Sequence, residues 1–292
     1  MAGDILFRGD LKKWERFANS LRFKLLMRIS GAVDVRAELQ ALWTAGDLIL
    51  SPEDDAFFNF TAGQPNNFRL VTARVGDFNL FLMSETMEGI LNRFQDPRAA
   101  RYFRPTANNP QAFRGLRNGQ DASQLSISIA DFSLSGRIFR EEGGAMRGQF
   151  LTSFEQKFFV AEAMQRGLLS GDPQPWYEAA VAEAFAFWQV PLPATYLTQG
   201  PAAFASAADK IELIMVQKWL AMPVNFYEGW TEHRRTGFPA LLPVAASLNN
   251  GIMPRRMPYP ATEDALNNAN FQQAAAATDG NSFNVDVWWA KR

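Results

Sequence analysis

Apolar residues recur at three- and four-residue spacing near the start of the chain, and this pattern predicts a pair of helices. The first runs from Asp10, which can cap its start, to Gly31, which can end it. Its apolar face carries Leu11, Trp14, Ala18, Leu21 and Leu25. This spacing is typical of an amphipathic helix. A second helix is expected from about Asp34 to Gly46, so the two would form an antiparallel hairpin.

The stretch from Leu48 to Gly148 lacks sustained apolar periodicity, because Phe, Asn, Gly and Pro are scattered through it. It contains only short periodic pieces, of which Ser84 to Phe94 is one. Leu125 to Ile129 alternates apolar with polar residues, which predicts a short strand. We therefore expect a loop-rich segment with a small amount of β-structure.

A helix is predicted to start at Ser153, because Ser153 and Gln156 have the spacing of a capping box. This helix is expected to continue to Gly167. Asp172 then supplies a cap directly before a proline in the first turn of another helix. Further helices are expected from Asp172 to about Trp188, from Ser206 to Pro223, from about Asn225 to Gly237, and from Thr262 to Ala275.

These elements predict a mostly α protein that forms a single domain over residues 1–292. It would contain a helical hairpin in residues 1–47, a loop-rich segment in residues 48–148 and a helical part in residues 149–292. The helical hairpins resemble tetratricopeptide-type pairs in form, although no regular repeat period can be counted.

Composition and charge exclude several classes of protein. The 29 Lys and Arg residues nearly balance the 30 Asp and Glu residues, so no positive field exists to attract nucleic acid. The chain has no cysteine, which excludes thiol nucleophiles and thiolate metal sites. No apolar run is long enough to span a membrane, and Met1 to Asp10 lacks the pattern of a secretory signal.

Catalytic chemistry has few candidate residues in this chain. His233 is the single histidine, and any Ser-His-Asp mechanism would depend entirely on it. We expect it to pack rather than to react. Glu53, Asp54 and Asp55 form the densest acidic cluster, but a helix N-terminus or a solvated turn explains them more simply than a glycosidase pair. We expect neither a metal nor a cofactor.

Arg234 and Arg235 lie near the end of a predicted helix, where positive charge is favourable. They could pair with Glu228 or Glu232 at turn spacing. A solvated ion network is the simpler interpretation, and binding of an anionic ligand is the alternative. The tryptophans on the predicted helices are expected to belong to the core. These are Trp14, Trp219 and Trp230.

Five blocks of residues follow one another in order along the chain. They are Gly9-Asp10 with Trp14, Phe17 to Leu21 and Arg28-Ile29; Asp96 to Arg98; Phe159 to Ala163 with Arg166-Gly167; Gln217 to Trp219, Glu228 to Trp230 and Arg234 to Pro239; and Pro254 to Pro260 with Glu263, Asn267, Asn270 and Val287 to Trp289. Together they resemble the SusD/RagB family, especially its SusD-like lipoprotein branch. The resemblance extends from Gly9 to Trp289 and implies a SusD-like fold.

This resemblance implies a function without bond chemistry. Family members capture oligosaccharide or polysaccharide at the outer-membrane cell surface and deliver it to a SusC-like TonB-dependent transporter. They usually begin with a lipoprotein signal, an acylated cysteine and helical repeats, which this chain lacks. We therefore expect it to be about the carboxy-terminal two-thirds of such a protein. The alternatives are a protein-interaction scaffold within the transporter complex and, less favoured, a glycoside hydrolase.

Glycan binding usually combines aromatic faces, which bury the C–H patches of sugar rings, with amides and charges around them. Two stretches of the loop-rich segment offer this mixture, from Asp55 to Phe60 and from Arg101 to Arg114. The second is preferred because it follows the family-like turn at Asp96. Its candidate ligand-binding residues are Tyr102, Phe103, Asn108, Asn109 and Arg114. Core packing by the aromatics and turn formation by the asparagines is the competing interpretation.

Overall fold

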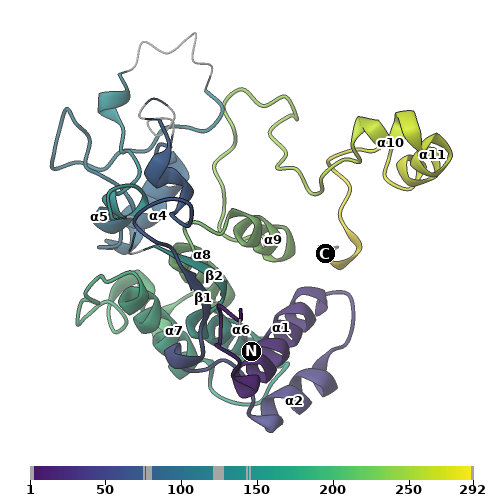
Figure 1. Ribbon diagram of the computed structural model, residues 1–292, viewed down its shortest axis with the longest axis horizontal. Helices are drawn as coiled ribbons and strands as arrows, with labels where there is room; N and C mark the ends of the chain where they lie inside the picture. Colours follow the sequence, from purple (N-terminus) through teal and green to yellow (C-terminus); the bar gives the residue numbers. More distant parts are fainter. Residues whose placement is uncertain are drawn as a thin grey trace.

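The computed structural model describes residues 3–74, 76, 81–120, 128–142, 144 and 146–290. Helices lie at one end of the molecule, and a loop-rich part lies beyond them (Figure 1). The segment after Gly237, which we call the carboxy-terminal excursion, stands to one side (Figure 1). This arrangement is the mostly α fold with little β-structure that the sequence predicts. Within the described residues, no helix combines the length and apolar composition that a membrane crossing requires.

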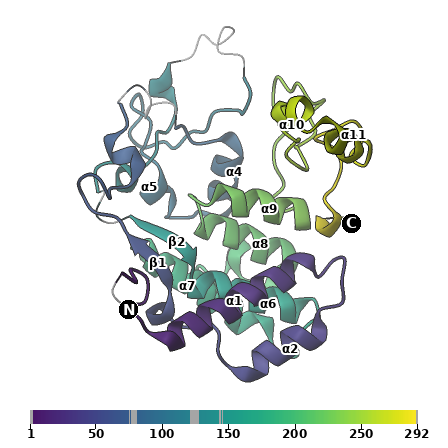
Figure 2. The same ribbon diagram turned by 45° about the vertical axis from the view of Figure 1, so that its right-hand side comes forward.

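The helical core is built around α6 (Ser153–Gln165), which packs most extensively against α7 (Pro173–Phe187). Helix α8 (Lys210–Ala221) packs against both, and α1 (Leu11–Ile29) covers another side of α6 (Figure 2). The residues of α6 from Ser153 to Met164 are all buried. Because several of them are polar or charged, this central helix requires partners for those groups as well as apolar neighbours.

The two helices expected near the amino terminus are present, but the predicted apolar face of the first is wrong. Its Leu11, Leu21 and Leu25 are exposed, and the buried positions of this helix are Ser20, Phe23, Lys24, Leu26 and Met27, because α6 covers a different face. Asp10 accepts hydrogen bonds from the backbone N–H groups of Lys12 and Lys13 at the start of α1. Helix α1 ends at Ile29, and Ser30 rather than Gly31 occupies its C-cap. Helix α2 (Arg36–Ala45) returns beside it (Figure 2) and ends at Gly46, whose φ of 73° is the left-handed conformation that favours glycine. Nothing about this pair tests the tetratricopeptide-type likeness, which stays a prediction.

Two helix starts differ from the expected ones in the capping side chain. The side chain of Thr152, rather than that of Ser153, caps α6 by accepting from the backbone N–H of Glu155. Asp209 caps α8, whereas Ser206 belongs to a preceding turn of 3-10 helix. In each case the side chain one residue before the first helical turn is the cap, because that position has extended backbone.

The other helices lie close to their expected positions, with one break. Helix α7 begins after Asp172, and α9 (Phe226–Thr236) is capped by Asn225 and ended by Gly237. Near the carboxy terminus, the single expected helix is two, α10 (Ala261–Leu266) and α11 (Asn268–Ala276). Asn267 separates them with φ −140° and ψ 39°, and Thr262 lies inside α10 rather than capping it.

The loop-rich segment contains α4 (Glu85–Phe94), α5 (Ala99–Tyr102) and a two-stranded antiparallel sheet of β1 (Ala56–Asn59) and β2 (Arg147–Leu151). The expected strand at 125–129 takes no part in this sheet. Residues 125–127 lie outside the described residues, and Ile129 begins a turn of 3-10 helix. A strand requires a pairing partner, and β1 finds its partner about ninety residues away, which no local pattern reveals.

A buried ion pair joins the loop-rich part to α8. Arg98 Nη2 lies 2.6 Å from Asp96 Oδ2 and 2.7 Å from Gln217 Oε1, and both members of the pair are fully buried. Tyr196 donates to the same Asp96 carboxylate at 2.7 Å. Such a pair holds its surroundings in place because removal of one partner would leave an uncompensated buried charge.

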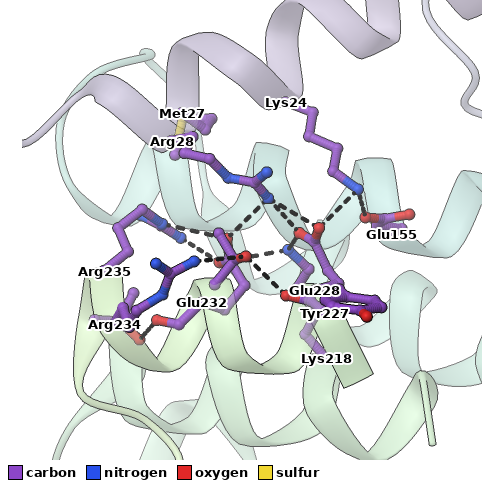
Figure 3. A network of polar contacts seen from close by, with 12 residues as sticks. Lys24, Met27, Arg28, Glu155, Lys218, Tyr227, Glu228, Glu232, Arg234 and Arg235 are labelled. Atoms are coloured by element: carbon purple, nitrogen blue, oxygen red, sulfur yellow. Dashed lines mark hydrogen bonds and ion pairs between the residues drawn. The ribbon is translucent and has the colours of Figure 1, made fainter. Parts of the chain in front are cut away.

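A second and larger ion network joins α1, α6, α8 and α9 (Figure 3). Glu228 on α9 lies 2.8 Å from Arg28 Nη2 and 3.0 Å from Lys24 Nζ, both on α1. Lys24 also contacts Glu155 of α6 at 2.6 Å. Lys218 of α8 reaches the same Glu228 carboxylate at 3.4 Å. Side chains of α1 and α8 therefore meet around one carboxylate of α9, and α6 joins them through Glu155 and Lys24.

The same network extends along α9 to its last turn. Arg235 pairs with Glu232 and with Glu162 of α6, and its side chain is only 5% exposed. The expectation of a solvated ion network at this helix end is therefore wrong. The pairing with Glu232 is as expected, but α6 covers the arginine and removes it from water. Although burial opposes ionisation, Arg235 and Lys218 hold the pKa of Glu232 well below its usual range.

The aromatic rings of the tryptophans that were expected in the core are only half-buried. Trp219 and Trp230 are half-buried, as is Trp14 on α1, so these rings lie at the margin of the core. Arg234 stacks on Trp230 with its guanidinium carbon 3.7 Å from the ring centroid. His233 Nδ1 lies 3.0 Å from the carbonyl oxygen of Pro239. The histidine thus contacts the turn that follows α9.

We predict that Glu228→Gln lowers the free energy of unfolding by about 3 kcal/mol, because it leaves Lys24, Arg28 and Lys218 without their shared buried carboxylate. Urea unfolding at neutral pH measures this. The control is Glu38→Gln, which breaks an exposed pair with Arg22 whose side chains are 52% and 60% exposed. That variant should change stability by about 0.5 kcal/mol or less. Equal effects of the two substitutions would contradict the role given to the buried network.

Candidate functional site

A cavity with a volume of about 780 Å³ opens between the small sheet, the loop-rich part and the start of α9. This volume falls in the range of small-molecule sites. Its lining is mostly apolar and rich in aromatic rings. These rings are Phe60, Phe68, Phe81, Tyr102, Phe103, Phe139, Trp219 and Phe226.

One wall of the cavity is a chain of aromatic contacts that begins beside β1. Phe60 meets Phe68 edge-on with ring centroids 5.4 Å apart, and Phe68 meets Phe139 at 6.4 Å. Gly148 of β2 also belongs to the lining, and a Cβ there would lie 3.4 Å from the Phe60 ring. Because the rings support one another, they form a stiff apolar surface of the kind that can stack on a sugar ring.

Another wall is the turn between α8 and α9. It contributes Trp219 at the end of α8 and then the run from Met222 to Phe226. Gly229 of α9 lies against Trp219, so that a Cβ at this glycine would be 3.2 Å from the indole ring. The ion network fixes α9 against α1, α6 and α8, and it thereby fixes this wall.

Few polar groups line the cavity. Arg147 is the one charged side chain among its described lining residues. Its guanidinium carbon lies 4.8 Å from the ring centroid of Phe57 and 5.3 Å from that of Phe187, which are favourable cation–π distances. The other polar side chains of the lining are Ser84, Asn118, Ser135, Gln149 and Asn225. Amides and hydroxyls of this kind can pair with sugar hydroxyls.

Gln149 is the lining residue with unmet hydrogen-bonding capacity. Its amide nitrogen and oxygen are both shielded from solvent, and neither has a hydrogen-bond partner within the described part of the chain. An unpaired buried amide costs free energy that a water molecule or a ligand hydroxyl would recover. The residue therefore marks the β2 side of the cavity as a place where a polar ligand group would be stabilised.

The structure brings two of the five predicted ligand-binding residues to this cavity. Tyr102 and Phe103 belong to its lining. Tyr102 is fully buried, its hydroxyl donates to the carbonyl oxygen of Leu220 at 2.9 Å, and its ring meets Trp188 edge-on. Burial raises the pKa of this tyrosine. Its ring thus contributes apolar wall, and its hydroxyl is already engaged.

The other three predicted residues lie outside the described lining. Asn108 donates to Asp131 Oδ1 at 2.7 Å, and Asn109 Oδ1 accepts from the backbone N–H of Gln111. The guanidinium of Arg114 lies over Phe132, 5.1 Å from its centroid. These contacts are those of loop-stabilising residues. Ligand contact by any of the five stays a prediction.

The contribution of α8 and α9 to the site is absent from the predictions made on the sequence. The helical pattern assigns Trp219 to the core and gives Phe226 no role. One sequence signal could have identified Phe226. Two adjacent aromatics follow Pro223 and Asn225 at a helix start, where first-turn side chains are commonly exposed. Asp55 to Phe60 is mostly strand β1 rather than loop, although its last residue reaches the cavity.

The acidic cluster lies apart from the described cavity lining. Asp54 pairs with Arg16 of α1 at 2.8 Å. Asp55 accepts from the backbone N–H of Ser153 at 2.6 Å and so joins the start of β1 to the start of α6. Among the described residues, no group of three or more His, Asp or Glu side chains is arranged to hold a metal ion.

We predict that Asp55→Asn stabilises the protein at neutral pH. Burial raises the pKa of Asp55 from 3.8 to about 6, while its hydrogen bonds to Ser153 oppose the shift and Glu183 adds to it. The folded state therefore prefers the protonated carboxyl. Its stabilisation is fully present below the unfolded-state pKa of 3.8 and is lost as the pH rises through about 6.

The asparagine side chain of this variant would keep the acceptor for Ser153 without the charge. We therefore expect a gain of about 2 kcal/mol at pH values well above 6 and a difference that disappears in acid. Thermal and urea unfolding across the pH range measure it. The matched control is Asp54→Asn, which removes the salt bridge to Arg16. A constant difference between Asp55→Asn and the parent at every pH would contradict the assignment.

Comparison with known proteins agrees with this architecture. A family described as starch-binding and associating with the outer membrane, the SusD-like family, matches residues 1–260. A SusD homologue from Bacteroides vulgatus superposes with a TM-score of 0.85 at 25% identity, covering 99% of this chain and 64% of that one. A chitin-binding SusD homologue from Flavobacterium johnsoniae gives 0.81 at 25% identity, covering 99% and 66%.

A SusD homologue from Bacteroides fragilis shares the fold with a TM-score of 0.83 at 24% identity, covering 99% of this chain and 70% of that one. This chain thus spans about two-thirds of the length of these structures. A comparison with curated proteins finds no match. Because the family match covers most of the sequence and the solved homologues share the fold, this chain belongs to the SusD-like family.

Proposed function

We propose that this protein binds an oligosaccharide or polysaccharide in the aromatic-lined cavity and releases it unchanged. The observation that carries the proposal is the composition of the lining, which combines stiff aromatic walls with a few amides, hydroxyls and one guanidinium. Apolar faces bury the C–H patches of sugar rings, and the polar groups orient the hydroxyls. Family membership and the chitin-binding homologue support a glycan as the ligand class.

Delivery to a transporter is the second part of the proposal. The protein would act at the outer-membrane cell surface and would hand its glycan to a SusC-like TonB-dependent transporter. The family description, which names association with the outer membrane, supports the membrane part of this proposal. Modest affinity suits that task, because a wet, polar ligand must be held and then released. No cofactor or bond-making step enters the proposal.

The chemistry of the lining favours binding over hydrolysis. A glycosidase normally needs two carboxyl groups on either side of the scissile bond. No Asp or Glu is among the described residues that line the cavity. Asp54 and Asp55, the carboxylates that a hydrolase mechanism would have to use, are engaged with Arg16 and with the backbone of Ser153.

The test is calorimetric titration of the purified protein against a panel of soluble polysaccharides, with the same mixtures assayed for new reducing ends. We expect binding of at least one polysaccharide and no release of reducing ends. Reducing ends that disappear in Asp54→Asn or Asp55→Asn would establish a hydrolase instead. Failure to bind any glycan would overturn the proposal.

We predict that Phe68→Ala weakens binding of the recognised glycan roughly tenfold, because one stacking surface of the cavity is lost. The matched control is Phe150→Ala on β2, whose ring is 56% exposed and is not part of the described lining. That variant should bind as the parent does. Melting temperatures of both variants separate loss of binding from loss of fold, and equal affinities of the two would place the glycan elsewhere.

A further inference from the structure

Two large aromatic side chains beside the cavity are about three-quarters exposed to solvent. Phe226 is 75% exposed and Tyr227 is 74% exposed, and they are the first two residues of α9. Rings so exposed contribute little to folding, because they bury little apolar area. An adjacent pair of this kind at the edge of a cavity is therefore a candidate contact surface.

The backbone that carries these rings is held firmly. Asn225 caps α9 by accepting from the backbone N–H of Glu228. Glu228, the next residue after the pair, is bound by Lys24 and Arg28 in the buried network. Each ring can therefore move only about its own side-chain torsions. Aromatic side chains have few of these, so that ordering them on a ligand costs little entropy.

The pair is continuous with the cavity. Asn225 and Phe226 belong to the cavity lining, and Tyr227 follows directly on the surface. Exposed aromatic surface thus continues from Phe226 in the lining to Tyr227, the next residue of α9, outside it. A ligand that only fills the cavity would leave Tyr227 uncovered, whereas a longer chain leaving the cavity at this edge would pass over it.

We infer that Tyr227, together with the outer face of Phe226, forms an external subsite that holds a polysaccharide where it leaves the cavity. The protein then selects long glycan chains over short oligosaccharides, because only a long chain occupies the cavity and the external subsite together. This inference rests on the proposed glycan-binding function. It adds chain length as the property that the site distinguishes.

The experiment titrates the parent protein and Tyr227→Ala with a polysaccharide that the panel identifies and with size-fractionated oligosaccharides prepared from it. For the parent, affinity should rise with chain length until the external subsite is filled. For Tyr227→Ala, the Kd of the polysaccharide should rise roughly tenfold, which corresponds to about 1.4 kcal/mol. The Kd of the shortest oligosaccharide that binds should stay unchanged.

The matched control is Tyr259→Ala. Tyr259 is also solvent-exposed, but it lies in the carboxy-terminal excursion before α10 and outside the described cavity lining. This variant should bind glycans of every length as the parent does. Because both tyrosines are exposed, neither substitution is expected to prevent folding, and melting temperatures verify this.

Two results would overturn the external subsite while leaving the proposed function intact. One is a parent protein that binds glycans of all lengths equally well. The other is a Tyr227→Ala variant whose affinity is unchanged at every length, which would show that the glycan does not contact Tyr227. A parent protein that binds no glycan of any length would instead overturn the proposed function itself.

Discussion

The buried carboxylate of Glu228 is the point on which the helical architecture depends. Cations from α1 and α8 converge on it, and neighbouring pairs extend the network through Glu155 and Glu162 of α6 (Figure 3). A charge can remain in a protein interior only when its partners are held at short distance, so the network allows few arrangements of these helices. The cost of burying the charges is offset by their mutual attraction, and the result is a defined position for α9.

The position of α9 also sets the position of one wall of the cavity. Helix α9 begins at the cavity, and Trp219 at the end of α8 lies against Gly229 of α9. The charged network that holds α9 therefore also positions the aromatic wall at its start. A second buried pair, Asp96 with Arg98, attaches the loop-rich part to Gln217 of α8. The wall at the start of α9 and the wall in the loop-rich part are thus both anchored to α8, which limits how far they can move apart.

The lining of the cavity has the composition that the proposed glycan binding requires. Aromatic rings supply a surface for the apolar faces of a sugar, and a small number of amides and hydroxyls give orientation. The carboxylates nearest in sequence to β1 are used to hold the fold together, since Asp54 binds Arg16 and Asp55 binds the start of α6. These carboxylates are therefore structural, and the described lining itself contains neither Asp nor Glu.

The sequence by itself determined most of the helices, because capping residues and apolar spacing act within one or two turns. Asp10, Asp172 and Gly237 mark helix ends where they were expected. Only the tertiary structure decided the pairing of β1 with β2, the burial of Arg235, and the arrival of Tyr102 and Phe103 at a cavity that Asn108, Asn109 and Arg114 do not line. Each of these depends on residues far apart in the chain, and a local pattern of polar and apolar positions carries no information about which distant surface will cover it.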